Sequence, residues 1–254
     1  MSRIPALDRR QLLARTAAVA GGMVLGGAAD LAGSASAAEM PRVYTRAEWN
    51  ARPPAQPATV IAKPDHLVVH HTASGNTTDY SLGQAFALSH WIQDLHMDTN
   101  GWGDSGQQLT ISRGGHVMEG RNRSLQAIGQ GKNVFGAQTL NHNGHTLGIE
   151  NEGIYVSAAP PQRLWESLVT TLTWLCDLYV LDPHVAIVGH RDYVATQCPG
   201  DVFYAMLPDL RNAVASRLGR RERERSKPSA RSGLPGPTAP FDHGPALGPG
   251  EVPT

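Results

Sequence analysis

Segments with a helical period alternate along this chain with short apolar runs that are typical of strands. The clearest helical segment is 161–180, where apolar side chains recur every three or four positions and form one broad stripe. Pro161 stands at its start, where the first turn of a helix tolerates proline. Because such a stripe must be buried against a second layer, the alternation predicts an α/β domain with a central mixed β-sheet flanked by helices.

The remaining elements follow from shorter patterns. Strands are predicted at 66–71, 108–112, 116–119, 147–151 and 185–188, the second and third joined in a β-hairpin by a glycine turn. Helices are predicted at 45–49, 81–98 and 203–214. The strand at 147–151 is expected to lie near the centre of the sheet.

The first 38 residues have the layout of an export signal. Arg9 and Arg10 form a pair, a mildly apolar stretch rich in alanine and glycine follows at 16–33, and small residues precede Glu39. This order is typical of a twin-arginine signal peptide with a cleavage site. A transmembrane anchor is the alternative, but several glycines and Asp30 make the stretch too weakly apolar. We therefore expect a signal peptide at 1–38 and no stable membrane anchor after its removal.

The end of the chain differs in composition from the middle. Arg and Glu alternate at 220–225, and Pro, Gly, Ser and Ala dominate 226–254. Such a segment cannot bury enough apolar surface to offset the entropy lost on ordering, so we expect a disordered tail at 219–254. One domain at 41–218 remains, and it is long enough for a single core. The formal net charge is zero, so no overall positive field indicates nucleic acid binding.

Three good metal ligands follow predicted strands. His70 lies at the end of the strand at 66–71, His190 follows the strand at 185–188, and Cys198 lies in a polar loop just beyond. Two nitrogen ligands and one sulfur ligand that leave a fourth position open are typical of catalytic zinc, whereas structural zinc sites fill all four positions with protein atoms. The sequence therefore predicts a Zn²⁺ site at these three residues.

Two further residues resemble these ligands in type. Cys176 lies within the apolar stripe of 161–180, where a free cysteine behaves as a small hydrophobic residue. His71 follows His70 directly, and successive strand residues point to opposite faces, so only one of the two is expected to bind metal. For Cys198 itself, an inert half-buried thiol is the alternative.

Several motifs in a fixed order are similar to those of one family. They are R-A-E-W-N-A-R-P at 46–53, V-V-H-H-T-A at 68–73, G-W-G-D-S-G at 101–106, G-G-H-V-M-E-G at 114–120, G-H-R-D at 189–192 and C-P-G at 198–200. The set resembles the type 2 N-acetylmuramoyl-L-alanine amidases and their relatives, the peptidoglycan recognition proteins. No single motif is unique, but the ordered set is specific and covers about 43–218.

The resemblance implies a fold and a function. It implies a mixed sheet with a substrate groove over the metal, and it places the zinc ligands at His70, His190 and Cys198. The implied reaction is hydrolysis of the amide between N-acetylmuramic acid and L-alanine in peptidoglycan. The protein would act as a secreted or wall-associated monomer whose partner is peptidoglycan and not nucleic acid. Non-catalytic relatives typically lose the cysteine ligand, often to serine, so Cys198 favours an enzyme.

One position departs from the family pattern. Many relatives have a tyrosine, thought to assist the attacking water or the intermediate, where this chain has Gln107, and glutamine cannot accept a proton near neutral pH. Another branch uses the first glutamate of G-I-E-x-E-G, which matches 148–153 here. Glu150 is thus the candidate general base, with a strand-end salt bridge as its alternative role, and Glu152 is its rival. Thr196 matches a Lys or Thr in relatives and is assigned a supporting role.

Three functions follow from these interpretations. The first is a zinc amidase with Glu150 as base, and the second is a non-catalytic peptidoglycan-binding module, which Gln107 would suit. The third is a cysteine hydrolase that pairs Cys198 with His190, although it leaves His70 without a role. The polar loop at 141–145 either lines the groove or is simply solvated.

Overall fold

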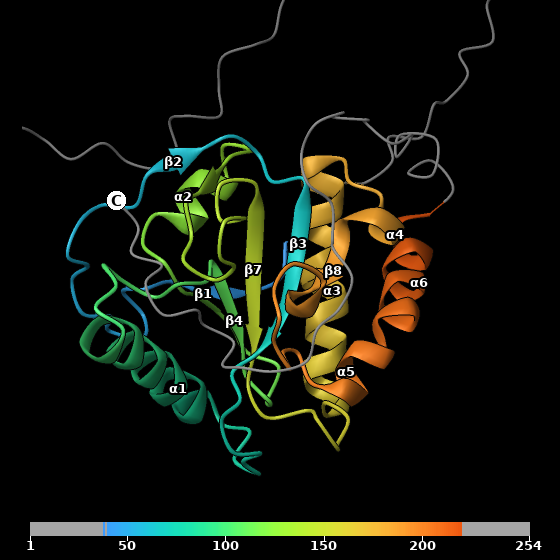
Figure 1. Ribbon diagram of the computed structural model, residues 1–254, viewed down its shortest axis with the longest axis horizontal. Coiled ribbons are helices and arrows are strands. Elements are labelled where there is room, and N and C mark those ends of the chain that lie inside the picture. Colours follow the sequence, from blue (N-terminus) through green and yellow to red (C-terminus); the bar gives the residue numbers. More distant parts are fainter. Residues whose placement is uncertain (1–37, 39, 220–254) are drawn as a thin grey trace, which may run out of the picture. The chain divides into compact units, whose positions relative to one another are not determined.

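The computed structural model describes Ala38 and residues 40–219 (Figure 1). Apart from Ala38 and Gly219, the predicted signal peptide and tail lie outside the described residues. The described part is built on one six-stranded mixed sheet with helices packed around it, which confirms the predicted fold class. None of the helices within residues 40–219 combines the length and apolar character needed to cross a bilayer.

The centre of the main sheet is parallel. Its strands are, in order, β1 (Val43–Tyr44), β5 (Val117–Glu119), β4 (Leu109–Ile111), β7 (Thr146–Asn151), β3 (His66–His71) and β8 (Ile187–Gly189). β3 pairs in parallel with β7 and β8, and β7 with β4, whereas β4 and β5 form the predicted antiparallel hairpin. A separate antiparallel pair joins β2 (Val60–Ile61) to β6 (Asn133–Val134), next to the short helix α2 (Ser124–Ile128). The C-terminal ends of β3, β7 and β8 therefore meet at one edge.

One face of the sheet packs against α3 (Gln162–Tyr179) and α6 (Leu207–Leu218), which lie together on one side (Figure 1). Alternate strand residues supply the sheet's part of this core: Leu67, Val69, Leu109, Ile111, Leu147 and Ile149. The apolar stripe of α3 supplies the other part, and Cys176 is fully buried in it, as predicted. Each fully buried leucine or isoleucine contributes about 1.5–3 kcal/mol to the stability of the fold.

The opposite face of the sheet carries the other set of alternating side chains. His70 and Thr110 both stand in register with Glu150, on β3, β4 and β7 respectively, so their side chains point to the same side of the sheet. Helix α1 (Leu82–Asp94) covers the β5 end of this face by packing on Met118. The strand period thus places the candidate polar residues on the face away from α3 and α6.

Two local predictions were wrong. Residues 45–49 form a turn and not a helix, although the capping box is present, with the Thr45 N–H donating to Glu48 Oε2 at 2.8 Å. Asn50 takes a positive φ of 55° directly afterwards, which stops helical propagation. The predicted strand at 185–188 is divided, because α4 (Pro183–Ala186) occupies its first half and β8 begins only at Ile187.

Local signals explain α4 and the other boundaries. The Asp182 side chain accepts the backbone N–H of His184, which caps α4 and outweighs the β-propensity of the residues that follow. The last predicted helix is two helices, α5 (Asp201–Ala205) and α6, because Pro208 has no N–H to continue the ladder. The helix predicted at 81–98 is α1 followed by a π-helical turn, Leu95–Thr99.

Candidate active site and metal centre

Three side chains converge at the C-terminal edge of the sheet. His70 is the last residue but one of β3, His190 follows β8 directly, and Cys198 lies in the loop before α5. Because β3 and β8 are parallel neighbours, their ends lie together. The potential ligand atoms of the three residues all lie within 4.8 Å of one another, and His70 Nδ1 is 3.7 Å from Cys198 Sγ. All three side chains are buried.

Gln138 sets the tautomer of His70. Gln138 Nε2 donates to Thr146 Oγ1 at 2.7 Å, so its Oε1 is the acceptor that lies 2.7 Å from His70 Nε2. His70 therefore carries its proton on Nε2 and turns an unprotonated Nδ1 toward Cys198. Metal-binding histidines commonly donate their second N–H to such a partner. Burial lowers the pKa of His70 to about 3, so the ring is neutral at pH 7.

His190 presents a buried nitrogen with no protein partner. Its Nδ1 makes no hydrogen bond, and its ring lies against that of His70 with centroids 4.4 Å apart. Burial holds the pKa of His190 well below its usual value. The turn that carries it is held by Asp192, which accepts the N–H of Gly189 at 2.8 Å and the hydroxyl of Tyr204. Buried polar atoms are almost always paired, so this nitrogen is available to coordinate a metal ion.

Cys198 is held in place through its backbone. Its N–H donates to Thr196 Oγ1 at 3.2 Å, and its carbonyl accepts both the backbone N–H of Arg191 (3.2 Å) and Arg191 Nε (3.4 Å). The N–H of His71 points at the sulfur from 3.4 Å. Burial, and after it the charge of Glu150, raise the pKa of the Cys198 thiol well above its usual value. The thiol therefore needs a nearby cation to ionise.

These donors fit a zinc ion. Two neutral imidazoles and one cysteine sulfur are common zinc ligands, and three protein donors leave a fourth position for a non-protein ligand, as in catalytic sites. The same facts disfavour a cysteine nucleophile, because the His190 and His70 rings are neutral and no imidazolium stabilises a thiolate. His71 takes no part in the cluster, since its Nδ1 accepts the N–H of Tyr155 at 3.3 Å.

Glu150 lies beside the candidate metal centre, on the same face of the sheet as His70. It stands between His70 on β3 and Thr110 on β4, in register with both. Its Oε2 is buried and has no hydrogen-bond partner, so the alternative of a strand-end salt bridge does not apply to this oxygen. Burial raises the pKa of Glu150 to about 8. A buried carboxyl with an unpaired oxygen is positioned to exchange a proton with a group in the site.

Glu152 is engaged elsewhere. One of its carboxylate oxygens accepts Gln84 Nε2 at 2.7 Å and the other accepts the backbone N–H of Arg113 at 2.7 Å. It follows the end of β7 and ties α1 to the loop after β4. Both oxygens are therefore occupied by hydrogen bonds that hold the fold together, in contrast to Glu150.

Gln107 and Thr196 contact the site through other residues. Gln107 Nε2 donates to Thr110 Oγ1 at 2.8 Å, and Thr110 is the strand neighbour of Glu150. Gln107 Oε1 is buried without a hydrogen-bond partner. Thr196 is fully buried and holds the backbone of Cys198. The contacts of both residues therefore fit a supporting role.

Comparison with known proteins identifies the family. A family model described as N-acetylmuramoyl-L-alanine amidase matches residues 61–201, a segment that contains His70, Glu150, His190 and Cys198. The chain belongs to this family. Its relatives include amidases and peptidoglycan recognition proteins, so membership supports either cleavage or binding of peptidoglycan.

Curated relatives of this amidase-family chain occur in animals. Human N-acetylmuramoyl-L-alanine amidase is 32% identical over 199 residues, which is 77% of this chain and 33% of the human protein. Peptidoglycan-recognition protein LB of Drosophila melanogaster is 26% identical over 164 residues, which is 65% of this chain and 66% of that protein. The chain thus spans about a third of the length of the human amidase that it matches.

Solved structures agree with the amidase-family fold. Drosophila PGRP-LB superposes with a TM-score of 0.57 at 25% identity, covering 65% of this chain and 92% of that one. Drosophila PGRP-SD gives 0.57 at 28% identity, covering 66% and 94%. The endolysin amidase LysCS from Clostridium intestinale shares the fold, with a TM-score of 0.54 at 22% identity over 71% of this chain and 97% of that one.

Two residues that shape this amidase-family site, Gln138 and Arg191, were not predicted from the sequence. Gln138, which orients His70, lies in a loop without any periodic pattern. Arg191 lies within a recognised motif, but its clamp on the Cys198 loop depends on a contact that only folding creates. Part of the polar loop at 141–145 supports the site, because Asn143 Oδ1 accepts the backbone N–H of Gln138 at 2.7 Å.

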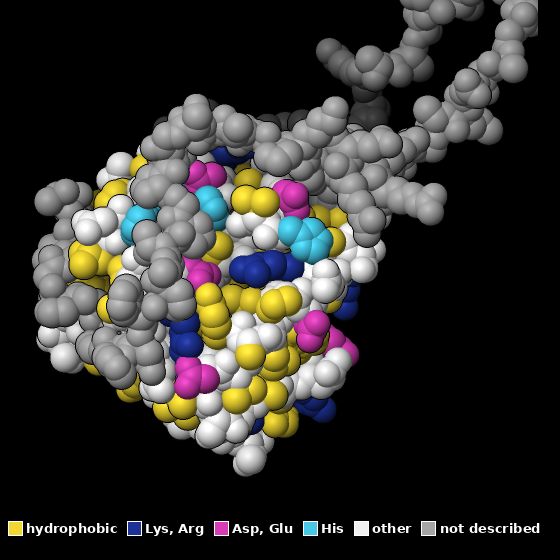
Figure 2. Space-filling view, turned by 45° about the vertical axis from the view of Figure 1, so that its right-hand side comes forward, with side chains coloured by type: hydrophobic (Ala, Val, Ile, Leu, Met, Phe, Trp, Pro, Cys, Tyr) yellow, Lys and Arg dark blue, Asp and Glu magenta, His cyan; other side chains and the backbone are white. Residues whose placement is uncertain are grey.

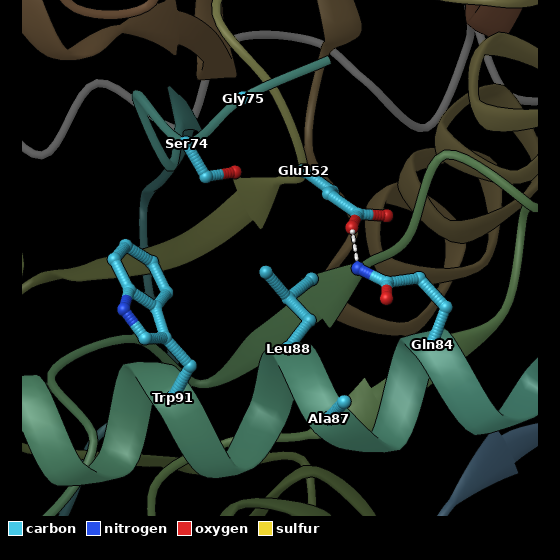
Figure 3. A pocket seen from close by; sticks show the side chains of 7 residues that line it. All are labelled: Ser74, Gly75, Gln84, Ala87, Leu88, Trp91 and Glu152. Atoms are coloured by element: carbon cyan, nitrogen blue, oxygen red, sulfur yellow. Dashed lines mark hydrogen bonds between the residues drawn. The ribbon is translucent and has the colours of Figure 1, made fainter. Parts of the chain in front are cut away.

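A groove opens at the same edge of the sheet as the candidate metal centre (Figure 3). Its volume is about 450 Å³. Ser74 follows β3 and Glu152 follows β7, and α1 supplies the facing wall with Gln84, Leu88 and Trp91. Figure 3 shows Trp91 and Gln84 projecting from α1 toward these loops, with the Gln84–Glu152 hydrogen bond closing one end. The Trp91 side chain is exposed, so an aromatic face is available to a ligand.

Proposed function

We propose that this protein is a zinc-dependent amidase that hydrolyses the bond between N-acetylmuramic acid and L-alanine in peptidoglycan. The observation that carries the proposal is the convergence of His70, His190 and Cys198 beside Glu150, whose buried Oε2 has no hydrogen-bond partner. Family membership supports the substrate class. When bound, zinc supplies a Lewis acid that polarises a carbonyl and acidifies water.

Residues of the chain supply the other roles in the proposed reaction. Gln138 holds the Nε2 proton of His70, which keeps Nδ1 free for coordination. Glu150 Oε2 accepts a proton from the attacking water and later returns it to the leaving amine, as a general base and then a general acid. Burial raises the pKa of Glu150 to about 8, so the carboxyl can both take up and release a proton near neutral pH. The hydrogen bond from Gln107 to Thr110 holds the side chain of Thr110 on β4, next to Glu150.

The groove beside α1 is the proposed binding site for the glycan and its stem peptide. It offers polar groups from Ser74 and Gln84 together with the apolar surface of Leu88 and Trp91. A structurally similar complex, the ectodomains of peptidoglycan recognition proteins LCa and LCx, is described as bound to tracheal cytotoxin, with a TM-score of 0.57 at 27% identity. We propose that the protein acts outside the cytoplasm, on the basis of the twin-arginine pattern at Arg9 and Arg10, and that it acts as a monomer.

A non-catalytic binding module is the second candidate, and Gln107 favours it. This residue replaces a tyrosine of many relatives, and glutamine cannot accept a proton near neutral pH. The retention of Cys198 favours the enzyme, because its buried sulfur completes the donor set and lies outside the apolar cluster that α3 forms with the sheet.

Digestion of purified sacculi separates these candidates. The zinc-loaded protein should release free stem peptides detectable by mass spectrometry, lose this activity with a chelator and regain it with Zn²⁺. Cys198→Ser should release none, whereas Cys176→Ala should lose stability and keep the zinc and the activity. Binding to sacculi without any release would establish the binding module, and release that survives chelation would establish a metal-free hydrolase.

A further inference from the structure

A second cluster of metal-binding side chains lies at the other end of β3. Asp65 Oδ1 is 2.9 Å from His66 Nδ1 and 2.7 Å from His145 Nδ1. One potential ligand atom from each of the three residues lies within 4.8 Å of the other two. The cluster has no role in the amidase chemistry proposed above.

Neighbouring parallel strands bring these residues together, as they do in the first cluster, but at the N-terminal ends of the strands. Asp65 and His66 stand at the start of β3, and His145 directly precedes β7. The two strands are parallel neighbours, and the N–H of Asp65 donates to the carbonyl of His145 at 3.0 Å, which locks the two loops together. His66 and His70 are four strand residues apart, roughly 13 Å, so no single ion or ion pair can serve both clusters.

His145 has a hydrogen-bond partner for its other ring nitrogen, Nε2, as metal-binding histidines commonly do. His145 Nε2 lies 3.1 Å from His142 Nδ1, so His145 can coordinate through Nδ1 while His142 orients its ring. Tyr193 forms an aromatic wall, stacked on His142 with centroids 4.1 Å apart and near His66 at 6.0 Å. The Tyr193 hydroxyl is buried without a hydrogen-bond partner.

An ion can reach this cluster from solvent. The side chains of Asp65, His66 and His145 are 20%, 12% and 13% exposed, in contrast to the fully buried ligands of the first site. On the face drawn in Figure 2, histidine side chains reach the surface next to acidic ones. Two atoms bound to one tetrahedral ion at bond lengths near 2.1 Å lie about 3.4 Å apart. The Asp65–histidine contacts of 2.9 and 2.7 Å therefore need to lengthen by roughly 0.5–0.7 Å, with the ion replacing the protons that they now share.

We propose that Asp65, His66 and His145 form a second transition-metal site, with His142 as the residue that orients His145. Two imidazoles and one carboxylate select Zn²⁺, Ni²⁺ or Cu²⁺ over Mg²⁺ and Ca²⁺, which prefer oxygen ligands alone. A bound ion ties the loop before β3 to the loop before β7 and thereby stabilises the sheet that carries His70. The site does not depend on amidase activity.

Zinc stoichiometry tests this site directly. The full chain is stripped with a chelator, titrated with Zn²⁺ alone by calorimetry, and analysed for zinc after desalting. The wild type should bind two ions. His145→Asn should bind one, because the amide can still donate to Asp65 and preserve the fold but is a poor ligand. Cys198→Ser should also bind one, and the double variant none. The matched control His184→Ala, at an exposed histidine on α4, should bind two.

Cobalt distinguishes the two sites by their ligands. The Cys198 site should give a thiolate-to-cobalt charge-transfer band, and this band should persist in His145→Asn and vanish in Cys198→Ser. The second site should bind Co²⁺ without that band. A wild type that binds a single zinc ion, or a His145→Asn variant that still binds two, would overturn the proposal and leave Asp65 as a hydrogen-bond acceptor for two neutral histidines.

Discussion

His70 Nε2 lies 2.7 Å from Gln138 Oε1, and this contact decides which nitrogen of the histidine faces Cys198. Gln138 is itself oriented by Thr146, which accepts from its amide nitrogen. The contact thus joins the candidate metal centre to the loop before β7, so the geometry of a candidate ligand on β3 depends on a residue outside the recognised motifs.

Removal of this contact should weaken zinc binding. Gln138→Ala leaves the His70 Nε2–H without its acceptor and frees the ring to rotate, so zinc affinity should fall about 10–100-fold. Competition with a chromogenic chelator measures the change. Gln126→Ala, an exposed glutamine on α2, is the matched control and should keep wild-type affinity. Equal affinities in the two variants would show that Gln138 does not position His70.

Gly148→Ala on β7 should also disturb the contact between Gln138 and His70. A Cβ at Gly148 would lie 2.6 Å from Gln138 Cγ and 2.7 Å from its Cδ, so the side chain of Gln138 must move. We expect a loss of about 1–3 kcal/mol in unfolding free energy together with weaker zinc binding. Gly83→Ala in α1, whose Cβ would make only an ordinary contact of 3.6 Å, should keep zinc binding and should not lower the unfolding free energy, because alanine favours a helix more than glycine. Denaturant melts and zinc titrations of both variants check this, and an unimpaired Gly148→Ala would contradict it.

Glu150→Gln should separate chemistry from binding. The amide keeps the shape of the carboxyl but accepts no proton, so turnover should fall by about 10²–10⁴-fold. Zinc content and binding to sacculi should stay close to wild type, because Glu150 is not among the three ligands. Glu166→Gln, an exposed position on α3, serves as the control. Unchanged turnover in Glu150→Gln would remove Glu150 as the base and direct attention to Glu152.

Arg191→Lys should loosen the loop that presents Cys198. The guanidinium of Arg191 contacts the carbonyls of Gln197 and Cys198 and pairs with Asp201 at 2.8 Å, and a lysine cannot make these contacts at once. We expect weaker zinc binding and faster alkylation of Cys198 in the metal-free protein. Mass spectrometry after iodoacetamide treatment reports the second effect, with Arg163→Lys as an exposed control.

Local patterns were sufficient for the fold class and for placing His70, His190 and Cys198 as candidate ligands. The apolar stripe of α3 and the runs that became β3, β4, β5 and β7 have periods set by the backbone itself, so they can be recognised without tertiary contacts. His70 and His190 follow such runs, and parallel strands bring those ends together. Short elements were less predictable: α4 replaced half of a predicted strand because its capping by Asp182 outweighed local β-propensity.

The sequence by itself thus determined the mixed sheet, the helix that covers one face and the identity of the residues that converge at its edge. Tertiary structure alone decided the environment of each one. Glu150 and Glu152 share a motif, yet one has an unpaired buried oxygen and the other is tied to Gln84 and Arg113. Hydrogen bonding and burial depend on residues far apart in the chain, such as Gln138 beside His70 and His145 beside Asp65, and no local period encodes those contacts.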